Sequence, residues 1–264
     1  MPSGAGAPKV RISMPMNAVI LAAGVGARLG PGGGHPPKAL LRFGGKSLLQ
    51  RHLEILRRHG VTDVSIATGY RADLITAELA AIGAAGEVKT VFNPQYEDGS
   101  LVSLWKMRDE LTAGNDVLLM DADVLYDGRM MERLLTSMHR NCFLLDRNLE
   151  PSEEPVKLCI RDGQIVDFHK KLRIPCDFYG ESVGFFRLMP DIAADIVAAA
   201  QSYLDAGHNA AMYEEAIRDV VLKRLPGTFA YEDITGLPWV EIDFPEDVRR
   251  AEQDILSRLV DQEA

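Results

Sequence analysis

A glycine-rich loop carrying two positive charges follows the first apolar segment of the chain. Asn17–Leu21 is short and apolar, which predicts a buried strand, and it leads into a loop that holds Gly24, Gly26, Arg28 and, further on, Lys38. Glycine lets backbone N–H groups come close to phosphate oxygens, and the two cations supply opposing charge. The loop lacks both the Walker spacing and the third glycine of a dinucleotide fingerprint. It predicts a phosphate site of another kind, with a plain strand-to-helix turn as the alternative.

Two carboxylates follow a later apolar strand. Asp121 and Asp123 come directly after Asp116–Met120. Carboxylates two residues apart at a strand end can bind Mg²⁺, which prefers oxygen ligands and keeps substrate phosphates in its shell. Aspartate is also common in turns after strands, so a purely structural role stays open at this point.

The elements that must hold these residues alternate along the first half of the chain. Apolar patterns predict strands at 17–21, 61–68, 87–92 and 116–120, and helices at 48–60, 72–82 and 100–111. Alternating strands and helices predict an α/β fold with a Rossmann-like, mostly parallel sheet flanked by helices, whose ligands bind at the carboxyl ends of the strands.

The second half has a mixed pattern that predicts a second, smaller lobe. Strands are expected at 142–145, 156–160, 165–168, 182–188, 228–233 and 239–242, and helices at 191–206, 211–225 and 246–259. Asp162-Gly163 predicts a hairpin turn. We expect a disordered tail at 1–15 and one domain at 16–264.

The string L-A-A-G-x-G-x-R-L with a later P-K resembles the signature of nucleotidyltransferases with a glycosyltransferase-A-like fold. Those enzymes transfer a nucleoside monophosphate from an NTP to a small phosphate ester. Gly32-Gly33-Gly34 departs from the Ser or Thr often found in that loop. The resemblance implies catalytic roles for Arg28 and Lys38. It also implies a nucleotide site comprising Leu21, Ala22, Ala23, Gly24, Gly26, Gly69, Tyr70, Asn93 and Ser100.

The same resemblance implies a metal site. Val124-Leu125-Tyr126 after Asp123 is similar to the sequence after the family's metal-binding aspartate, and Glu241-Ile242-Asp243 is similar to its closing E-I-D segment. Asp123 is therefore expected to be the main Mg²⁺ ligand, with Asp121 beside it and Asp243 as the second carboxylate. Acidic residues before a helix also interact favourably with its dipole, which is the structural alternative for this last segment.

The resemblance also implies a nucleotide-binding half at about 16–140 and a smaller acceptor-binding half, or lobe, at about 141–264. Three segments of the second half imply its acceptor site. Lys170 is expected to hold the acceptor phosphate, and Glu181 lies in a G-E-x-x-G segment that lines the acceptor pocket in the family. Tyr213, Glu214 and Glu215 resemble the aromatic and acidic segment of cytidylyltransferases that act on phosphocholine and aminoalkyl phosphonates. Carboxylates and an aromatic face suit an ammonium group. Each segment also has a structural alternative. It is a solvated basic turn for Lys170, a charged strand edge for Glu181, and an amphipathic helix for the segment that holds Tyr213, Glu214 and Glu215.

Composition excludes several other classes. The chain has 264 residues and a net charge of −9, which argues against a large nucleic-acid-binding face. No apolar run is long enough for a membrane helix. Three cysteines without a C-x-x-C pair predict neither a disulfide framework nor a zinc site, and a cytoplasmic location is expected.

The sequence therefore predicts a Mg²⁺-dependent cytidylyltransferase that acts on CTP and a small phosphate or phosphonate monoester, with phosphocholine or 2-aminoethylphosphonate favoured. A nucleotidyltransferase for inositol 1-phosphate or a sugar 1-phosphate, and a D-x-D glycosyltransferase, are the alternatives. The choice of base and the oligomeric state, a homodimer included, stay open.

Overall fold

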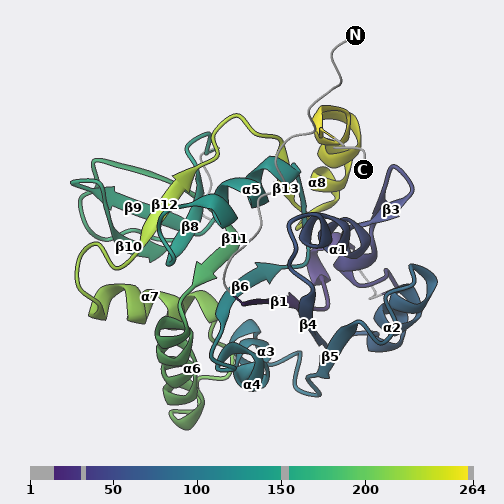
Figure 1. Ribbon diagram of the computed structural model, residues 1–264, viewed down its shortest axis with the longest axis horizontal. Coiled ribbons are helices and arrows are strands. Elements are labelled where there is room, and N and C mark those ends of the chain that lie inside the picture. The colour runs from purple at the N-terminus through teal and green to yellow at the C-terminus, as the bar shows by residue number, and fades with distance from the viewer. Residues whose placement is uncertain (1–14, 31–33, 150–154, 261–264) are drawn as a thin grey trace.

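The computed structural model describes residues 15–30, 34–149 and 155–260. Within them, a nine-stranded sheet runs through both halves of the chain, with the path β10-β9-β11-β6-β1-β4-β5 (Figure 1). Off this path, β8 pairs with β11 and β12 pairs with β8. The expected tail lies almost wholly outside the described residues, and so do residues 31–33 of the glycine-rich loop.

The parallel part of the sheet comes from the first half of the chain. Its strands are β1 (Met16–Ala22), β4 (Asp63–Thr68), β5 (Val88–Phe92) and β6 (Asp116–Asp121). Strand β1 pairs in parallel with β4 and β6, and β4 pairs in parallel with β5. Successive residues of β1 face opposite sides of the sheet, because Ala18 and Ile20 enter one core cluster and Val19 the other.

The second half adds antiparallel strands. The long β11 (Phe178–Leu188) pairs antiparallel with β6, β8 (Cys142–Asp146) and β9 (Lys157–Arg161). Strand β10 (Gln164–His169) forms the expected hairpin with β9, and β12 (Ala230–Asp233) pairs in parallel with β8. Two small two-stranded sheets are separate. One is the hairpin of β2 (Arg42–Phe43) with β3 (Lys46–Ser47), and the other pairs β7 (Val124–Tyr126) antiparallel with the distant β13 (Trp239–Glu241).

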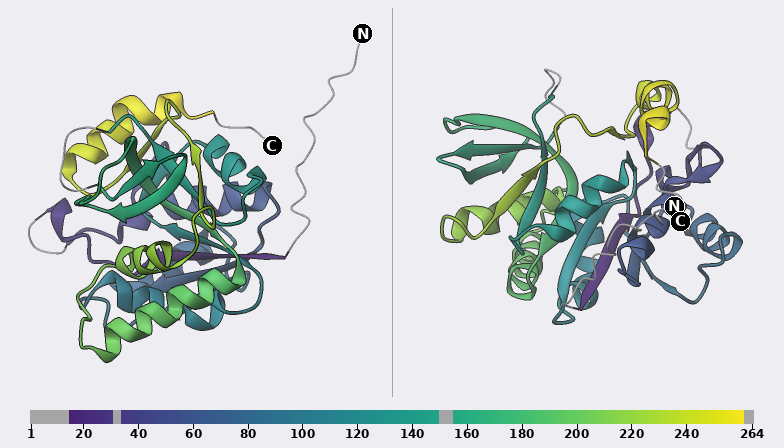
Figure 2. Two further views of the ribbon diagram at one scale, coloured as in Figure 1. Left: turned by 90° about the vertical axis from the view of Figure 1, so that its left-hand side faces the viewer. Right: turned by 45° about the horizontal axis from the view of Figure 1, so that its top comes forward.

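Helices cover both faces of the sheet. One face is covered by α1 (Leu48–Arg58), α2 (Ala72–Ala81) and α5 (Gly128–Thr136). The other face is covered by α3 (Ser100–Lys106), α4 (Arg108–Leu111), α6 (Pro190–Asp205) and α7 (Tyr213–Lys223). Helix α8 (Pro245–Arg250) lies on the opposite side of the molecule from α6 and α7 (Figure 2). The α/β class and the mostly parallel sheet flanked by helices are confirmed.

Some predicted elements differ in detail. The helix expected over 100–111 is interrupted at Met107, whose backbone angles (φ −87°, ψ 12°) leave the helical region. The helix expected over 246–259 changes its winding after Arg250, through a π-helical turn and then a 3₁₀ turn. Strand β7 and helix α5 are missing from the sequence prediction. The spacing of Met130, Met131, Leu134 and Leu135, all buried, could have revealed α5.

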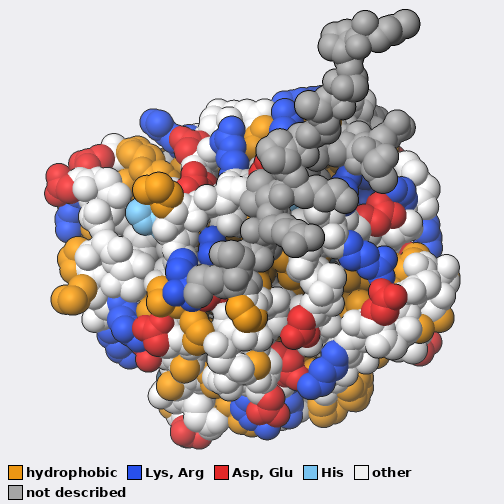
Figure 3. All heavy atoms as spheres, viewed as in Figure 1, with side chains coloured by type: hydrophobic (Ala, Val, Ile, Leu, Met, Phe, Trp, Pro, Cys, Tyr) orange, Lys and Arg blue, Asp and Glu red, His pale blue; other side chains and the backbone are white. Residues whose placement is uncertain are grey.

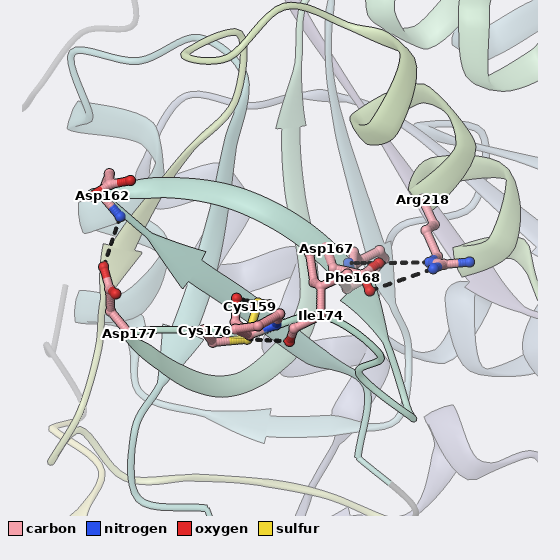
Figure 4. The surroundings of a disulfide bond; sticks show 9 residues. Cys159, Asp162, Asp167, Phe168, Ile174, Cys176, Asp177 and Arg218 are labelled. Atoms are coloured by element: carbon pink, nitrogen blue, oxygen red, sulfur yellow. Dashed lines mark hydrogen bonds and ion pairs between the residues drawn. A yellow bond between two sulfur atoms is a disulfide. The ribbon is translucent and has the colours of Figure 1, made fainter.

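The prediction that the cysteines form no disulfide is wrong for one pair. Cys159 of β9 and Cys176, in the segment between β10 and β11, form a disulfide bond (Figure 4). The hairpin and the return into β11 bring the two Cα atoms within 5.4 Å, a proximity that the odd cysteine count could not reveal. The bond ties the segment after Lys170 to strand β9.

Candidate active site

The carboxyl ends of the parallel strands bring the predicted nucleotide residues to one edge of the sheet. Leu21 and Ala22 end β1, Thr68 ends β4 and Phe92 ends β5. The backbone N–H of Tyr70 donates to the carbonyl of Ala23. Gly69 is tightly enclosed, because a Cβ there would lie 2.8 Å from that carbonyl oxygen and 2.4 Å from the Cβ of Tyr96. This edge offers small residues and backbone groups to a ligand.

Two predicted nucleotide residues have internal partners. Asn93 is fully buried and donates to the hydroxyl of Ser103. The hydroxyl of Ser100 accepts from the backbone N–H of Tyr213 at 3.0 Å, which joins the start of α3 to the start of α7. Both residues therefore help to hold this edge of the sheet against the helices.

Arg28 and Lys38, the two basic residues predicted to bind phosphate, each lie in a short 3₁₀ turn. These turns are Ala27–Leu29 and Lys38–Leu40. Gly26 has φ 65°, in the left-handed region, and a Cβ there would lie 3.1 Å from the Cγ of Lys38. Glycine at this position thus leaves room for the lysine side chain to cross the loop.

Lys38 and Arg28 converge on the predicted metal carboxylates. Lys38 Nζ lies 2.9 Å from Asp123 Oδ2 and 2.5 Å from Asp243 Oδ1. Arg28 Nη1 lies 3.3 Å from Asp243 Oδ2, and its guanidinium lies 5.5 Å from the centre of the Phe244 ring. Burial by itself lowers the pKa of Lys38, but the two carboxylates outweigh burial and raise it above its ordinary value. Lys38 is therefore positively charged at neutral pH.

Three carboxylates in the described part of the chain come together as a group that could hold a metal ion. Asp123, Glu241 and Asp243 each offer one oxygen, and these oxygens lie within 4.8 Å of one another. An all-oxygen set fits a hard divalent cation. Burial raises the pKa of Glu241 well above its ordinary value, and the negative charges of Asp123 and Asp243 raise it further. A bound cation would offset this crowding of negative charge.

Glu241 is a site residue that the sequence prediction missed. It ends β13, which pairs with β7, and the backbone N–H of Ile242 donates to the carbonyl of Asp123. This pairing brings the two segments of the cluster together. The signal was present, because Glu241 and Asp243 are two residues apart at the end of a strand and so share one side.

Asp121, which the sequence predicts as a metal ligand beside Asp123, lies outside this group. Its Oδ2 accepts a hydrogen bond from the Tyr213 hydroxyl at 2.7 Å. Burial raises the pKa of Asp121 well above its ordinary value, with the charges of Asp123 and Glu214 adding to the effect.

A cleft of about 510 Å³ opens beside the carboxylate group, and the predicted acceptor residues Lys170, Glu181, Tyr213 and Glu214 line it. Of the described residues in its wall, seven are acidic and three are basic. The acidic ones are Asp121, Asp146, Glu181, Glu214, Glu241, Asp243 and Asp247, and the basic ones are Arg28, Lys170 and Arg250. The cleft is therefore strongly acidic.

Besides Asp121 and Glu241, two further carboxylates of the cleft have raised pKa values. Burial raises the pKa of Glu214 to about 7, and burial together with the charge of Asp146 raises the pKa of Glu181 to about 7. Among the described residues, the buried Oε2 of Glu214 has no hydrogen-bond partner. Glu215, by contrast, pairs with His169 Nε2 at 3.1 Å and borders an adjoining cavity of about 210 Å³ rather than the main cleft.

A match to a known family decides the class of enzyme. Residues 18–164 match the model of the MobA-like NTP transferase domain. The chain belongs to this family. It is therefore a nucleotidyltransferase, as the glycine-rich string predicted.

Three relatives of this NTP transferase are each less than 30% identical to it in sequence. It is 29% identical to the CMP-5'-(3-aminopropyl)phosphonate synthase of Streptomyces rubellomurinus, over 91% of this chain but only 39% of that protein. It is 22% identical to the CTP:phosphoglutamine cytidylyltransferase of Campylobacter jejuni, over 88% of this chain and 98% of that protein. Its fold is similar to that of the CTP:phosphocholine cytidylyltransferase from Streptococcus pneumoniae, with a TM-score of 0.70, 23% identity, and coverage of 90% and 97% of the two chains.

The surface of this NTP transferase agrees with the charge pattern of the sequence. Acidic and basic side chains are interspersed over the face seen in Figure 3. No helix in the described part of the chain is both long and apolar enough to cross a membrane.

Proposed function

We propose that the enzyme transfers CMP from CTP to a small phosphate or phosphonate monoester with a cationic head, and releases pyrophosphate. The observation that carries the proposal is the acidic cleft, in which the buried Oε2 of Glu214 has no hydrogen-bond partner among the described residues. A buried carboxylate oxygen without a partner is costly, and an ammonium group would satisfy it. Phosphocholine and 2-aminoethylphosphonate both carry such a group.

The nucleotide side and the acceptor side of the site would each bind one of the two reactants. An oxygen of the acceptor phosphate attacks the α-phosphorus of CTP, a new P–O bond forms, and the bond to the bridging oxygen breaks as pyrophosphate leaves. Both reactants are anions, so Lys38 and Arg28 would offset their repulsion at the nucleotide, and Lys170 would hold the acceptor phosphate. Asp123, Glu241 and Asp243 would hold Mg²⁺, which neutralises phosphate charge when bound.

The relatives support cytidylyl transfer in particular. The Streptomyces, Campylobacter and Streptococcus proteins are all named for CTP or CMP chemistry on phosphonates, phosphoglutamine or phosphocholine. The chain spans less than half of the Streptomyces relative, so the acceptor has to be tested directly.

A polyol or sugar phosphate is the second candidate. Glu181, whose pKa is about 7, is partly protonated at neutral pH and can both donate to and accept from hydroxyl groups. Inositol 1-phosphate or a sugar 1-phosphate would use this end of the cleft without needing Glu214.

A pyrophosphate-release screen tests the proposal. It crosses four NTPs with phosphocholine, 2-aminoethylphosphonate, inositol 1-phosphate and a sugar 1-phosphate, and a UDP-sugar hydrolysis arm tests the glycosyltransferase alternative. We expect turnover with CTP and a cationic acceptor. The sharpest comparison pairs phosphocholine with 3,3-dimethylbutyl phosphate. This analogue has nearly the same shape, but an uncharged tert-butyl group replaces the trimethylammonium head. Equal use of both would overturn the cationic-head proposal and favour the polyol.

A further inference from the structure

The two aspartates of the D-x-D pair have different partners. Asp123 Oδ2 accepts from Lys38 Nζ at 2.9 Å and belongs to the carboxylate group that could hold a metal. Asp121 Oδ2 accepts from the Tyr213 hydroxyl at 2.7 Å, outside that group. Strand β6 ends at Asp121 and β7 begins at Val124, so the chain turns between the two carboxylates.

The carboxylate of Asp121 is held in place by strand β11. Gly184 has φ 77°, and a Cβ there would lie 2.1 Å from Asp121 Oδ2. Only glycine leaves the carboxylate this space. The backbone of β11 therefore packs directly against the carboxylate oxygen that accepts from Tyr213.

Tyr213 is fixed at both of its ends. Its backbone N–H donates to the Ser100 hydroxyl, its own hydroxyl donates to Asp121, and its ring meets Phe186 edge-on at 6.3 Å. The residue is 3% exposed and lines the cleft. These contacts leave the ring one position in the cleft wall.

We propose that Asp121 is a positioning residue for Tyr213 rather than a metal ligand, and that the pair fixes the aromatic wall against which the acceptor head packs. The choice of head rests on the proposed function, since an aromatic ring attracts an ammonium group. A ring that has lost its hydroxyl partner can turn away and then contributes less to acceptor binding.

Metal binding separates the two roles without any turnover. We would titrate Mn²⁺ and follow the free ion by electron paramagnetic resonance, comparing Asp121→Asn, Asp121→Ala and the matched control Asp123→Asn. Both Asp121 variants should bind Mn²⁺ within about threefold of wild type, whereas Asp123→Asn should lose about tenfold or more. An equal loss in Asp121→Asn and Asp123→Asn would overturn the proposal.

Acceptor kinetics test the positioning role. Asp121→Ala and Tyr213→Phe should each raise the acceptor KM about five- to tenfold, as expected for one lost hydrogen bond, and leave the CTP KM unchanged. Asp121→Asn keeps an oxygen that can accept from Tyr213, so its acceptor KM should return to within about twofold of wild type. The double variant Asp121→Ala/Tyr213→Phe should be no worse than its worse single variant.

Other outcomes also decide the matter. If Asn fails to rescue, or if the two single losses multiply in the double variant, Asp121 does not act through Tyr213. Should Asp121→Ala fail to fold by circular dichroism, Asp121→Asn and Tyr213→Phe still carry the test. If wild type rejects cationic acceptors, the proposed function fails, while the Mn²⁺ comparison and the KM ratios with the true acceptor still judge the role of Asp121.

Discussion

The proposed nucleotide edge and the proposed acceptor cleft would recognise their ligands with different parts of the chain. The nucleotide edge offers backbone groups and small residues such as Ala23, Gly24 and Gly69. The acceptor cleft offers charged side chains from several separate segments, among them Lys170, Glu181 and Glu214. A backbone cradle depends on a short local string, whereas a side-chain cleft depends on how distant segments meet. Substitutions should therefore affect the two substrates separately, except at the carboxylates between them.

The largest effect should come from those shared carboxylates. Asp123→Ala or Asp243→Ala should reduce metal-dependent turnover on the order of 10³-fold, because either change removes an oxygen from the group that also anchors Lys38. If the two act on one metal site, the double variant should cost little more than the worse single variant. Steady-state kinetics over a range of Mg²⁺ concentrations measures this, and multiplying losses would show separate roles.

The next effect belongs to the nucleotide side. Lys38→Ala should reduce kcat/KM about 10²–10³-fold, as expected when one charge-stabilising group is lost at a reacting phosphate. Arg28→Ala should cost less, because the Arg28 side chain is 48% exposed and its contact with Asp243 is longer. Arg249, which pairs with Glu246 on the surface, serves as the control position. Normal turnover in a folded Lys38→Ala would remove the phosphate-binding role.

A third test should change the KM for the acceptor and leave the KM for CTP unchanged. Glu214→Gln should raise the KM for a cationic acceptor about five- to 100-fold, which corresponds to a charge-assisted contact of about 1–3 kcal/mol. Glu215→Gln is the matched control, since Glu215 pairs with His169 away from the cleft. A parallel rise in the CTP KM would break the proposed separation of the two regions.

The pH dependence should sharpen the role of Glu214. Its pKa is raised to about 7 by burial, so it gains negative charge as the pH rises from 6 to 8. The KM for phosphocholine should fall over this range more in wild type than in Glu214→Gln, because the titration of the substrate phosphate is common to both enzymes. An equal fall in wild type and variant would assign the titration to another group.

The smallest effect should be on stability. Because the pKa of Glu181 is about 7 in the folded protein and near 4.5 when unfolded, its favourable contribution is fully present below about pH 4.5 and is lost as the pH rises through 7. Glu181→Gln should therefore show a smaller fall in Tm between pH 5 and 8 than wild type. Differential scanning calorimetry at several pH values measures this, and identical pH profiles would contradict it.

The sequence could predict the features that depend on local patterns, and it missed features that depend on contacts between distant segments. The strands, most helices and the glycine-rich loop depend on local patterns, and the observed β1, β4, β5 and β6 lie within a residue or two of their predicted bounds. The role of Asp121 was not readable, because the turn after β6 separates it from Asp123. The Cys159–Cys176 bond likewise depends on strand pairings that no single segment encodes. Glu241 differs, because its spacing from Asp243 was a readable local signal and only its contact with Asp123 depends on the pairing of β13 with β7.

Strand β11 restricts how substrates can enter. It contains eleven residues and hydrogen-bonds to β6 in the parallel half and to β8 and β9 in the other half. Swinging the acceptor lobe away as a rigid body would break backbone bonds along Phe185–Leu188 together, at about 1 kcal/mol each. Amide hydrogens in this strand should therefore exchange with solvent only through global unfolding. The two halves are therefore not expected to open the cleft by swinging apart about a hinge.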